Sequence, residues 1–238
     1  MYDFLTKRLE AKRPLSEDER KMYFKQLVVT VAALHERRIV HRDLKLDNIL
    51  VTSKVDPEHN CHLMKICDFG MSKGEGDSMC KSYVGTYSYR PPEIFAGRGF
   101  GQYSGKKADV WSLGVVLYLM KYYRWPFGGA DAHTLKRILN RQFESQTPVD
   151  DGGCGSLLLM MLSKNPEERP TCEDILRHPW LEGVKVPFEV EDKSENLSVQ
   201  TEEELVEFSK RIHDQAESIE RQEMVDLPSF EAPLDSAI

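Results

Sequence analysis

The chain has 238 residues and a formal net charge of −7, with 40% hydrophobic and 30% charged residues, a composition typical of one globular core. The charge is uneven, because residues 1–188 carry 28 Lys and Arg against 24 Asp and Glu, whereas residues 189–238 carry 4 against 15. A near-neutral body with an acidic tail argues against a nucleic-acid partner, and the lack of a long apolar run or a signal peptide predicts no membrane partner and a cytoplasmic or nuclear location.

The first part of the chain predicts two helices. Residues 2–11 show a short amphipathic pattern, which Pro14 ends. Ser16, followed three residues later by Glu19, has the form of a capping box and predicts the start of a longer helix. Apolar residues at three- and four-residue steps then place one stripe of this helix against a core: Tyr23, Phe24, Leu27, Val28, Val31 and Leu34.

A hairpin and a long loop are expected next. Short apolar runs at 48–52 and 63–67 flank turn-forming residues at 56–60, so they predict two paired strands. Glycine, proline, serine and tyrosine dominate residues 70–105, which indicates an ordered loop of the kind that usually carries function. The five cysteines are scattered without a C-x-x-C pair, which predicts reduced thiols.

The second half of the body is expected to be helical. Residues 109–120 are apolar on almost every face, as in a helix that is buried all round. Shorter helices are predicted near 156–162 and 171–177. The sequence therefore predicts a mainly α (α+β) domain over residues 1–187, followed by an acidic tail at 188–238.

Two motifs have the form of phosphoryl-transfer signatures. His41 to Asn48 reads HRDLKLDN, and Asp68 to Gly70 reads DFG, twenty residues after Asn48. Phosphoryl transfer needs a carboxylate to accept the proton of a substrate hydroxyl and two further oxygen donors to hold Mg²⁺ against the phosphates. Asp43, Asn48 and Asp68 are suitable residue types for these roles. Any one of them alone would more often be a loop cap, but two motifs in this order and spacing favour the catalytic interpretation.

These motifs resemble those of eukaryotic serine/threonine protein kinases. The resemblance implies ATP and Mg²⁺ as cofactors, protein substrates with a Ser or Thr acceptor, and the C-terminal lobe of the kinase fold, with short β-hairpins at the catalytic cleft. It assigns Asp43 as the catalytic carboxylate, and Asn48 and Asp68 as the residues that bind Mg²⁺ and the nucleotide. Lys45 would neutralise charge on the transferring phosphoryl group, and Leu50 would form the floor under the adenine ring.

The same resemblance assigns supporting roles. His41 and Phe69 would pack together behind the site, next to Gly70 of the same motif. Arg42 would pair with a phosphorylated loop residue. Asp109 resembles the aspartate that caps the buried helix and holds the backbone of the catalytic loop. A plain N-cap is the simpler interpretation of Asp109, and the two are compatible.

Residues 85–93 resemble the kinase loop that receives the substrate peptide. Thr86 would bond to Asp43 and to the neighbouring catalytic lysine, and so help to seat the acceptor hydroxyl. Glu93 would pair with Arg169, a carboxylate against a guanidinium fork that ties this loop to a distant helix.

Within the kinases, stretches such as 65–70 and 105–112 are similar to the calcium/calmodulin-dependent group, and in it to the osmotic-stress subclass of plant sucrose-nonfermenting-related kinases. That subclass carries serines in its activation loop, which the likeness places at Ser78 and Ser82 as targets of an upstream activating kinase. We favour Ser78, where a phosphate would add about 1.5 to 2 negative charges and pair with Arg42. An unmodified surface serine is the alternative.

The acidic tail carries a signal of its own. Thr201 to Glu204 has the form of a capping box, and residues 201–222 place apolar residues on one face with acids opposite. This pattern resembles the regulatory helix of the same subclass. A solvated or disordered acidic tail is an equally open interpretation.

No G-x-G-x-x-G pattern occurs among the 238 residues. In kinases this pattern belongs to an N-terminal lobe that covers ATP, so we expect that lobe to be missing and the chain to have little activity alone. Two functions stay open: a partial serine/threonine kinase domain, and a non-catalytic pseudokinase-like binding or scaffold module. The presence together of Asp43, Lys45, Asn48 and Asp68 favours the first.

Overall fold

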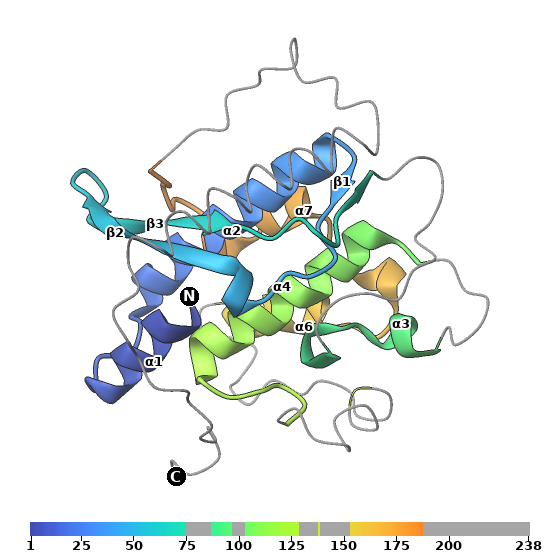
Figure 1. Ribbon diagram of the computed structural model, residues 1–238, viewed down its shortest axis with the longest axis horizontal. Helices are drawn as coiled ribbons and strands as arrows, with labels where there is room; N and C mark the ends of the chain where they lie inside the picture. The colour runs from blue at the N-terminus through green and yellow to red at the C-terminus, as the bar shows by residue number, and fades with distance from the viewer. Residues whose placement is uncertain (75–86, 97–102, 129–137, 139–152, 188–238) are drawn as a thin grey trace.

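Two long helices form the centre of the molecule. The structure, a computed structural model, describes residues 1–74, 87–96, 103–128, 138 and 153–187. Helices α2 (Glu17–Glu36) and α4 (Gly105–Tyr122) lie together in the middle, and the other elements pack around them (Figure 1). The hydrophobic core is continuous between these two helices and the shorter ones beside them.

The N-terminal helices form as the sequence predicts. Helix α1 (Tyr2–Glu10) sets the ring of Phe4 edge-on against Tyr23 of α2, with 5.9 Å between the ring centroids. Helix α2 begins at the predicted capping box: Ser16 Oγ accepts from the Glu19 N–H at 3.2 Å, and the Glu19 carboxylate accepts from the Ser16 N–H at 2.9 Å. This reciprocal pair satisfies two of the backbone donors that the start of a helix leaves unpaired.

Helix α4 is buried along most of its length, as its apolar sequence predicts. It extends beyond the predicted range of 109–120, because Ser104 caps it and the helix therefore begins at Gly105. The prediction that Asp109 caps this helix is wrong, since Asp109 lies one turn inside it. A buried aspartate at that position must find its hydrogen-bond donors elsewhere.

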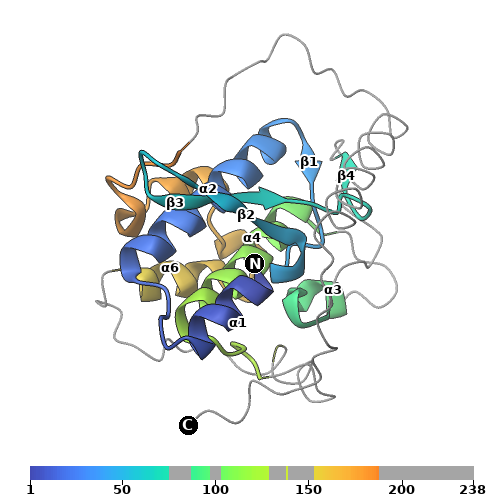
Figure 2. The same cartoon turned by 60° about the vertical axis from the view of Figure 1, so that its left-hand side comes forward.

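The predicted hairpin is present and longer than expected. Strands β2 (Ile49–Asp56) and β3 (Cys61–Ile66) pair antiparallel, with a register shift between Val51 and Val55. The hairpin lies across α2 in both ribbon views (Figure 2). A second, very short antiparallel pair, β1 (Ile39–Val40) with β4 (Lys73–Gly74), was not predicted, because two-residue strands leave no periodic pattern.

Gln26 of α2 fixes the hairpin to the body. Its side chain is fully buried, its Oε1 accepts from the Met64 N–H at 2.9 Å, and its Nε2 donates to the His62 carbonyl at 3.1 Å. The amide group thus bonds to β3 much as a neighbouring strand would. This contact sets the position of the strand that leads to Asp68.

The C-terminal elements close the core from the other side. Helix α6 (Cys154–Met161) packs on α4, and α7 (Cys172–Leu176) packs on α2. The short 3₁₀ helix η4 (Pro179–Leu181) then buries Trp180 against Phe24. Aromatic burial of this kind stabilises the end of the domain.

The predicted fold class is confirmed: the described part is helix-rich, with two small antiparallel sheets. No helix in the described ranges is long and apolar enough to span a bilayer. The four cysteines in these ranges are free thiols: Cys61, Cys67, Cys154 and Cys172. The helix predicted at 201–222 lies outside the described residues.

Candidate active site

The loop with the first motif connects β1 to β2 and is held by α4. Asp109 is almost fully buried, and its Oδ2 accepts from the His41 N–H at 2.9 Å while its Oδ1 accepts from the Arg42 N–H at 2.8 Å. The predicted hold on the loop backbone is therefore present. Arg42 has a left-handed φ of 66°, which is unfavourable for a residue with a side chain. The two bonds to Asp109 stabilise this turn and so fix the start of the loop.

Asp43, Lys45 and Asn48 meet within this loop. Lys45 Nζ lies 2.9 Å from Asp43 Oδ2. Asn48 Nδ2 donates to the Asp43 carbonyl at 2.9 Å and lies 3.2 Å from Asp43 Oδ2. The 3₁₀ helix η1 (Leu46–Asn48) makes the turn that brings Asn48 back to Asp43. The Asp43 carboxylate, only 8% exposed, is thus oriented by two neighbours, as a group that accepts a proton from a defined direction must be.

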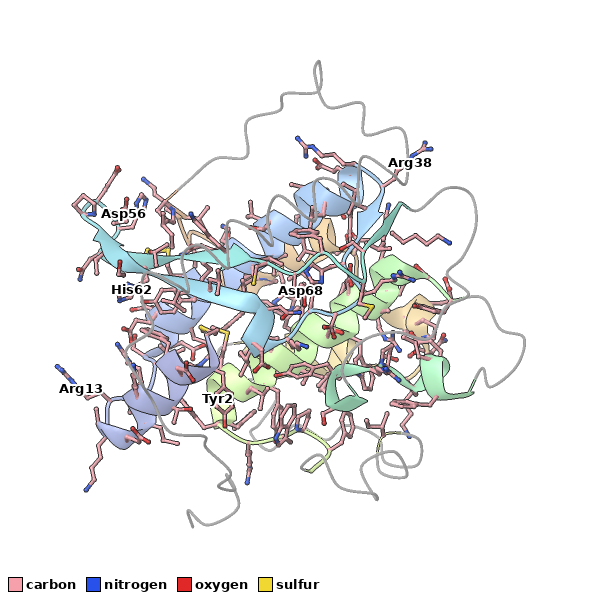
Figure 3. All side chains as sticks on the ribbon, viewed as in Figure 1. Tyr2, Arg13, Arg38, Asp56, His62 and Asp68 are labelled. Atoms are coloured by element: carbon pink, nitrogen blue, oxygen red, sulfur yellow. The ribbon has the colours of Figure 1, made fainter. Side chains whose placement is uncertain are left out.

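Asp68 lies beside the end of the same loop. The Cys67 N–H donates to the Asn48 carbonyl at 2.9 Å, so the residue before Asp68 is bound to the residue that ends the loop. Asp68 itself is exposed, has a left-handed φ of 61°, and accepts from the Gly70 N–H at 3.2 Å. Figure 3 shows Asp68 near the middle of the molecule, away from the hairpin tip that Asp56 marks. The two motifs therefore face one region.

His41 and Phe69 join the two motifs from behind. Their ring centroids are 4.9 Å apart, so the predicted packing is present. His41 Nε2 also lies 3.1 Å from the Cys67 carbonyl, to which it donates as a neutral imidazole. Burial lowers the pKa of His41, which favours this uncharged form.

The predicted pair of Glu93 and Arg169 is present. The two terminal nitrogens of Arg169 each lie 2.7 Å from one Oε of Glu93, which belongs to α3 (Pro92–Ala96). The Arg169 guanidinium is buried and lies over the Trp111 ring of α4, 4.9 Å from its centroid. Arg169 thus ties the segment around α3 to the central helix.

Tyr89 is a further contact of the loop that sequence reasoning did not single out. Its Oη accepts from the Leu46 N–H at 3.3 Å, and its carbonyl accepts from Ser112 Oγ at 3.0 Å. Burial raises the pKa of Tyr89 far above its usual value, so the phenol stays protonated. Tyr89 therefore connects the loop with Asp43 to α4. One tyrosine among several in its segment carries no signal that distinguishes it.

Most of the chain is similar in sequence to a known protein family. Residues 1–181, well over half of the chain, match the protein kinase domain family. The chain belongs to this family. Over 185 residues this kinase domain is 40% identical to serine/threonine-protein kinase SAPK1 of Oryza sativa subsp. japonica, a match covering 75% of this chain and 52% of the relative.

Two further relatives of the kinase domain extend the comparison. Serine/threonine-protein kinase SRK2F of Arabidopsis thaliana is 40% identical over 189 residues, 76% of this chain and 52% of the relative. NUAK family SNF1-like kinase 1 of Homo sapiens is 38% identical over 182 residues, 76% of this chain and 25% of the relative. The chain spans about half the length of the plant relatives and a quarter of the human one.

Asn48 and Asp68 carry side-chain oxygens of the kind that bind Mg²⁺. Within the described residues, no group of three or more His, Cys, Asp or Glu side chains could hold a metal ion by itself. An ion at Asn48 and Asp68 would therefore complete its coordination with phosphate and water oxygens. Mg²⁺ commonly binds in this way, through one or two carboxylates and the phosphates of a nucleotide.

The remaining predicted positions of the kinase domain are partly described. Leu50 on β2 is 38% exposed, so an apolar surface is available where the adenine floor is predicted. Arg42 Nε donates to the Met71 carbonyl at 2.6 Å, which links the loop to the segment after Gly70. Three predicted positions lie outside the described residues: Ser78, Ser82 and Thr86.

Proposed function

We propose that this kinase domain transfers the terminal phosphoryl group of Mg²⁺-bound ATP to serine or threonine hydroxyls of protein substrates. The observation that carries the proposal is the contact of Lys45 and Asn48 with the Asp43 carboxylate, with Asp68 held next to Asn48. A positioned carboxylate, an ammonium and two metal-binding oxygens are the groups that this reaction requires.

Each residue would have one task. Asp43 would accept the hydroxyl proton while the substrate oxygen bonds to phosphorus and the bond from phosphorus to the ADP oxygen breaks. Lys45 would balance negative charge on the transferring group, since its Nζ lies 2.9 Å from Asp43 Oδ2. Asn48 and Asp68 would hold Mg²⁺, which neutralises phosphate charge when bound. Positioning and charge stabilisation account for most of the catalysis in this reaction class.

The identity of the acceptor residue is inferred from the names of the relatives, and the nucleotide site from the position of Leu50. The rice and Arabidopsis relatives are named serine/threonine-protein kinases, which supports Ser or Thr as the acceptor. Thr86 would help to seat the acceptor hydroxyl, and Leu50 would lie under the adenine ring. The kinase domain would extend over residues 1–187, with the acidic tail at 188–238 in a regulatory role.

The subclass and its regulation are also proposals. We assign the chain to the osmotic-stress subclass of plant sucrose-nonfermenting-related kinases, in the calcium/calmodulin-dependent group. The 40% identity to the plant kinases SAPK1 and SRK2F supports this assignment. An upstream kinase of the cytoplasm or nucleus would phosphorylate Ser78, or Ser82, and the phosphate would pair with Arg42.

The test is transfer of labelled phosphate from ATP, with Mg²⁺, to a basic serine-containing peptide. The 238-residue chain is assayed alone and joined to a glycine-rich ATP-binding segment of a serine/threonine kinase. We expect Asp43→Asn to lower kcat by about a thousandfold, because a positioned base contributes that order of rate enhancement. Asp56→Asn is the matched control and should leave kcat unchanged, because this half-buried carboxylate bonds to His59 at the hairpin tip.

Two results would contradict the proposal. Transfer that survives Asp43→Asn would show that another group, or another protein, does the chemistry. No transfer from the joined chain, although it is folded and binds Mg²⁺ and ATP, would favour the non-catalytic binding or scaffold module instead.

A further inference from the structure

Three buried side chains from three helices form a line of contacts behind the catalytic loop. Cys172 Sγ, at the start of α7, lies 3.7 Å from His35 Nδ1, near the end of α2. His35 Nε2 lies 2.9 Å from Asp109 Oδ2 of α4. Their exposed fractions are 1% for Cys172, 6% for His35 and 1% for Asp109. We call these three residues the buried triad.

The buried triad is not a nucleophilic site. The order of cysteine, histidine and carboxylate is found in cysteine hydrolases, where an accessible thiolate attacks the substrate. Here no substrate can reach Cys172, and burial raises the pKa of its thiol far above the usual value, so the sulfur stays protonated. The role of the buried triad must therefore be structural.

The contacts of Asp109 show where the triad acts. Its carboxylate receives three donors: the His41 N–H, the Arg42 N–H and His35 Nε2. Because a carboxylate oxygen can accept hydrogen bonds but cannot donate one, His35 must donate through Nε2–H to Asp109 Oδ2. In a neutral imidazole Nδ1 is then an acceptor, and the Cys172 thiol lies next to it.

We propose that Cys172 is a positioning residue for the catalytic loop, which donates its S–H to His35 Nδ1 and thereby keeps the His35 Nε2–H directed at Asp109. Loss of this donor leaves Nδ1 unsatisfied in the core, and a ring flip or the other tautomer would then remove the third bond to Asp109. Asp109 also holds Arg42 in its left-handed conformation, directly before Asp43. A side chain on α7 thus acts on the reacting carboxylate through two others.

The first experiment reads the triad directly, with no need for activity. The full chain is labelled with ¹⁵N in histidine, and the His35 signals are assigned by their loss in His35→Gln. We expect Nε2 to be the protonated ring nitrogen in the wild type, mixed or reversed protonation in Cys172→Ala, and recovery in Cys172→Ser, because serine keeps a donor at this position.

The second readout is hydrogen exchange of the two amides that Asp109 accepts. In Cys172→Ala we expect the His41 and Arg42 amides to exchange about tenfold faster, the effect of weakening one buried hydrogen bond. Cys172→Ser should restore slow exchange. Cys154→Ala, which removes an equally buried thiol from α6, should leave both amides unchanged.

The outcomes separate this inference from the proposed function on which its catalytic part rests. A wild-type His35 protonated at Nδ1, alone or together with Nε2, or unchanged amide exchange in Cys172→Ala, would overturn it. If the domain is active, kcat should fall about tenfold in Cys172→Ala, with the peptide KM unchanged and with recovery in Cys172→Ser. A domain without activity would remove only this last readout and would leave the spectroscopic test decisive.

Discussion

Arg169 is a buried charged residue whose hydrogen-bonding groups have partners in the folded domain. Arg169 is fully buried, and its Nε donates to the Ser163 carbonyl at 2.8 Å in addition to its two bonds with Glu93. Its cost of desolvation is offset only because the planar guanidinium can make all of these contacts together. A lysine ammonium in the same place would carry the charge but could not make the two parallel bonds to Glu93 together with the bond to Ser163.

We therefore expect Arg169→Lys to lower the free energy of unfolding by about 3 kcal/mol, the range found when a buried ion pair is broken. Urea unfolding at unchanged m-value would measure this loss. Arg177→Lys is the control, because its pair with Asp174 is exposed, with 3.4 Å between the charged atoms, and should cost less than about 0.5 kcal/mol. Equal losses in the two variants would contradict the role given to Arg169.

His41 makes stability depend on pH. Burial lowers its pKa in the folded state, whereas the unfolded chain titrates near its ordinary value of about 6.5. Below that pH the unfolded state binds more protons than the folded state, so the free energy of unfolding falls as the pH drops through about 6.5. His178, whose pKa is also lowered by burial, acts in the same direction.

For buried His41 the slope should approach about 1.4 kcal/mol per pH unit between about pH 6 and 5, and partly exposed His178 should add less. His41→Tyr keeps an aromatic ring against Phe69 but does not titrate in this range, so it should flatten the curve. Urea midpoints measured from pH 7 to 5 would test this expectation. A variant with the slope of the wild type would assign the titration to other groups.

At the scale of elements, the approach of α4 to β1 depends on Gly105. A Cβ at this position would lie 2.8 Å from Val40 Cγ2 and 2.9 Å from Val40 Cβ, closer than side chains pack. The first turn of α4 can therefore touch the strand that leads into the catalytic loop only if residue 105 is glycine. Glycine is needed at position 105 because of this close contact between α4 and β1, and not because of its backbone dihedral angles.

Gly105→Ala should lower the free energy of unfolding by about 1 to 3 kcal/mol, the cost of overpacking, although alanine favours helix formation. Val40→Ala alone should also destabilise, because it leaves a cavity. In the double variant the close contacts with the two methyl groups of Val40 are removed and only the contact with its Cβ remains, so the loss should be smaller than the sum of the two. Additive losses in this double-mutant cycle, or a more stable Gly105→Ala, would contradict the contact.

Local patterns in the sequence predict local structure well here. The capping box at Ser16 starts α2 as expected, and the short apolar runs on either side of residues 56–60 give the hairpin. The start of α4 was missed because glycine and two lysines after Ser104 do not look like a buried helix. The prediction that Asp109 caps α4 was wrong because a buried aspartate inside a helix and a capping aspartate look alike in the sequence.

The candidate site was predictable in its residues and not in its contacts. Asp43, Lys45 and Asn48 lie within one short loop, so their spacing alone brings them together. The contacts that hold this loop join residues far apart in the chain. The residue numbers differ by 74 for His35 and Asp109, by 137 for His35 and Cys172, and by 43 for Leu46 and Tyr89. No periodic pattern reports such pairs, because they depend on how whole helices pack.

At the scale of the whole molecule, the charge of the chain changes close to the last described contacts of the core. Leu181 is fully buried. Near the end of the described residues, the Val184 carbonyl accepts a hydrogen bond from Lys25 Nζ of α2 at 2.6 Å. The match to the protein kinase domain family ends at residue 181. Residues 189–238 then bring 15 acidic and 4 basic residues, a composition from which we expect little contribution to a hydrophobic core.

A chain that ends at Pro187 should therefore keep the stability of the full chain, with a free energy of unfolding within about 0.5 kcal/mol. Urea unfolding of both chains, at low salt and at about 0.5 M salt, would measure this, because ionic strength screens attraction between the acidic residues and the near-neutral body. A loss on truncation at low salt alone would show that the tail binds the body by charge. A loss above about 1 kcal/mol at both salt concentrations would mean that apolar residues of the tail pack on the kinase domain. The boundary at residue 187 would then be wrong, since the cooperative unit would include part of the region that the charge pattern separates from it.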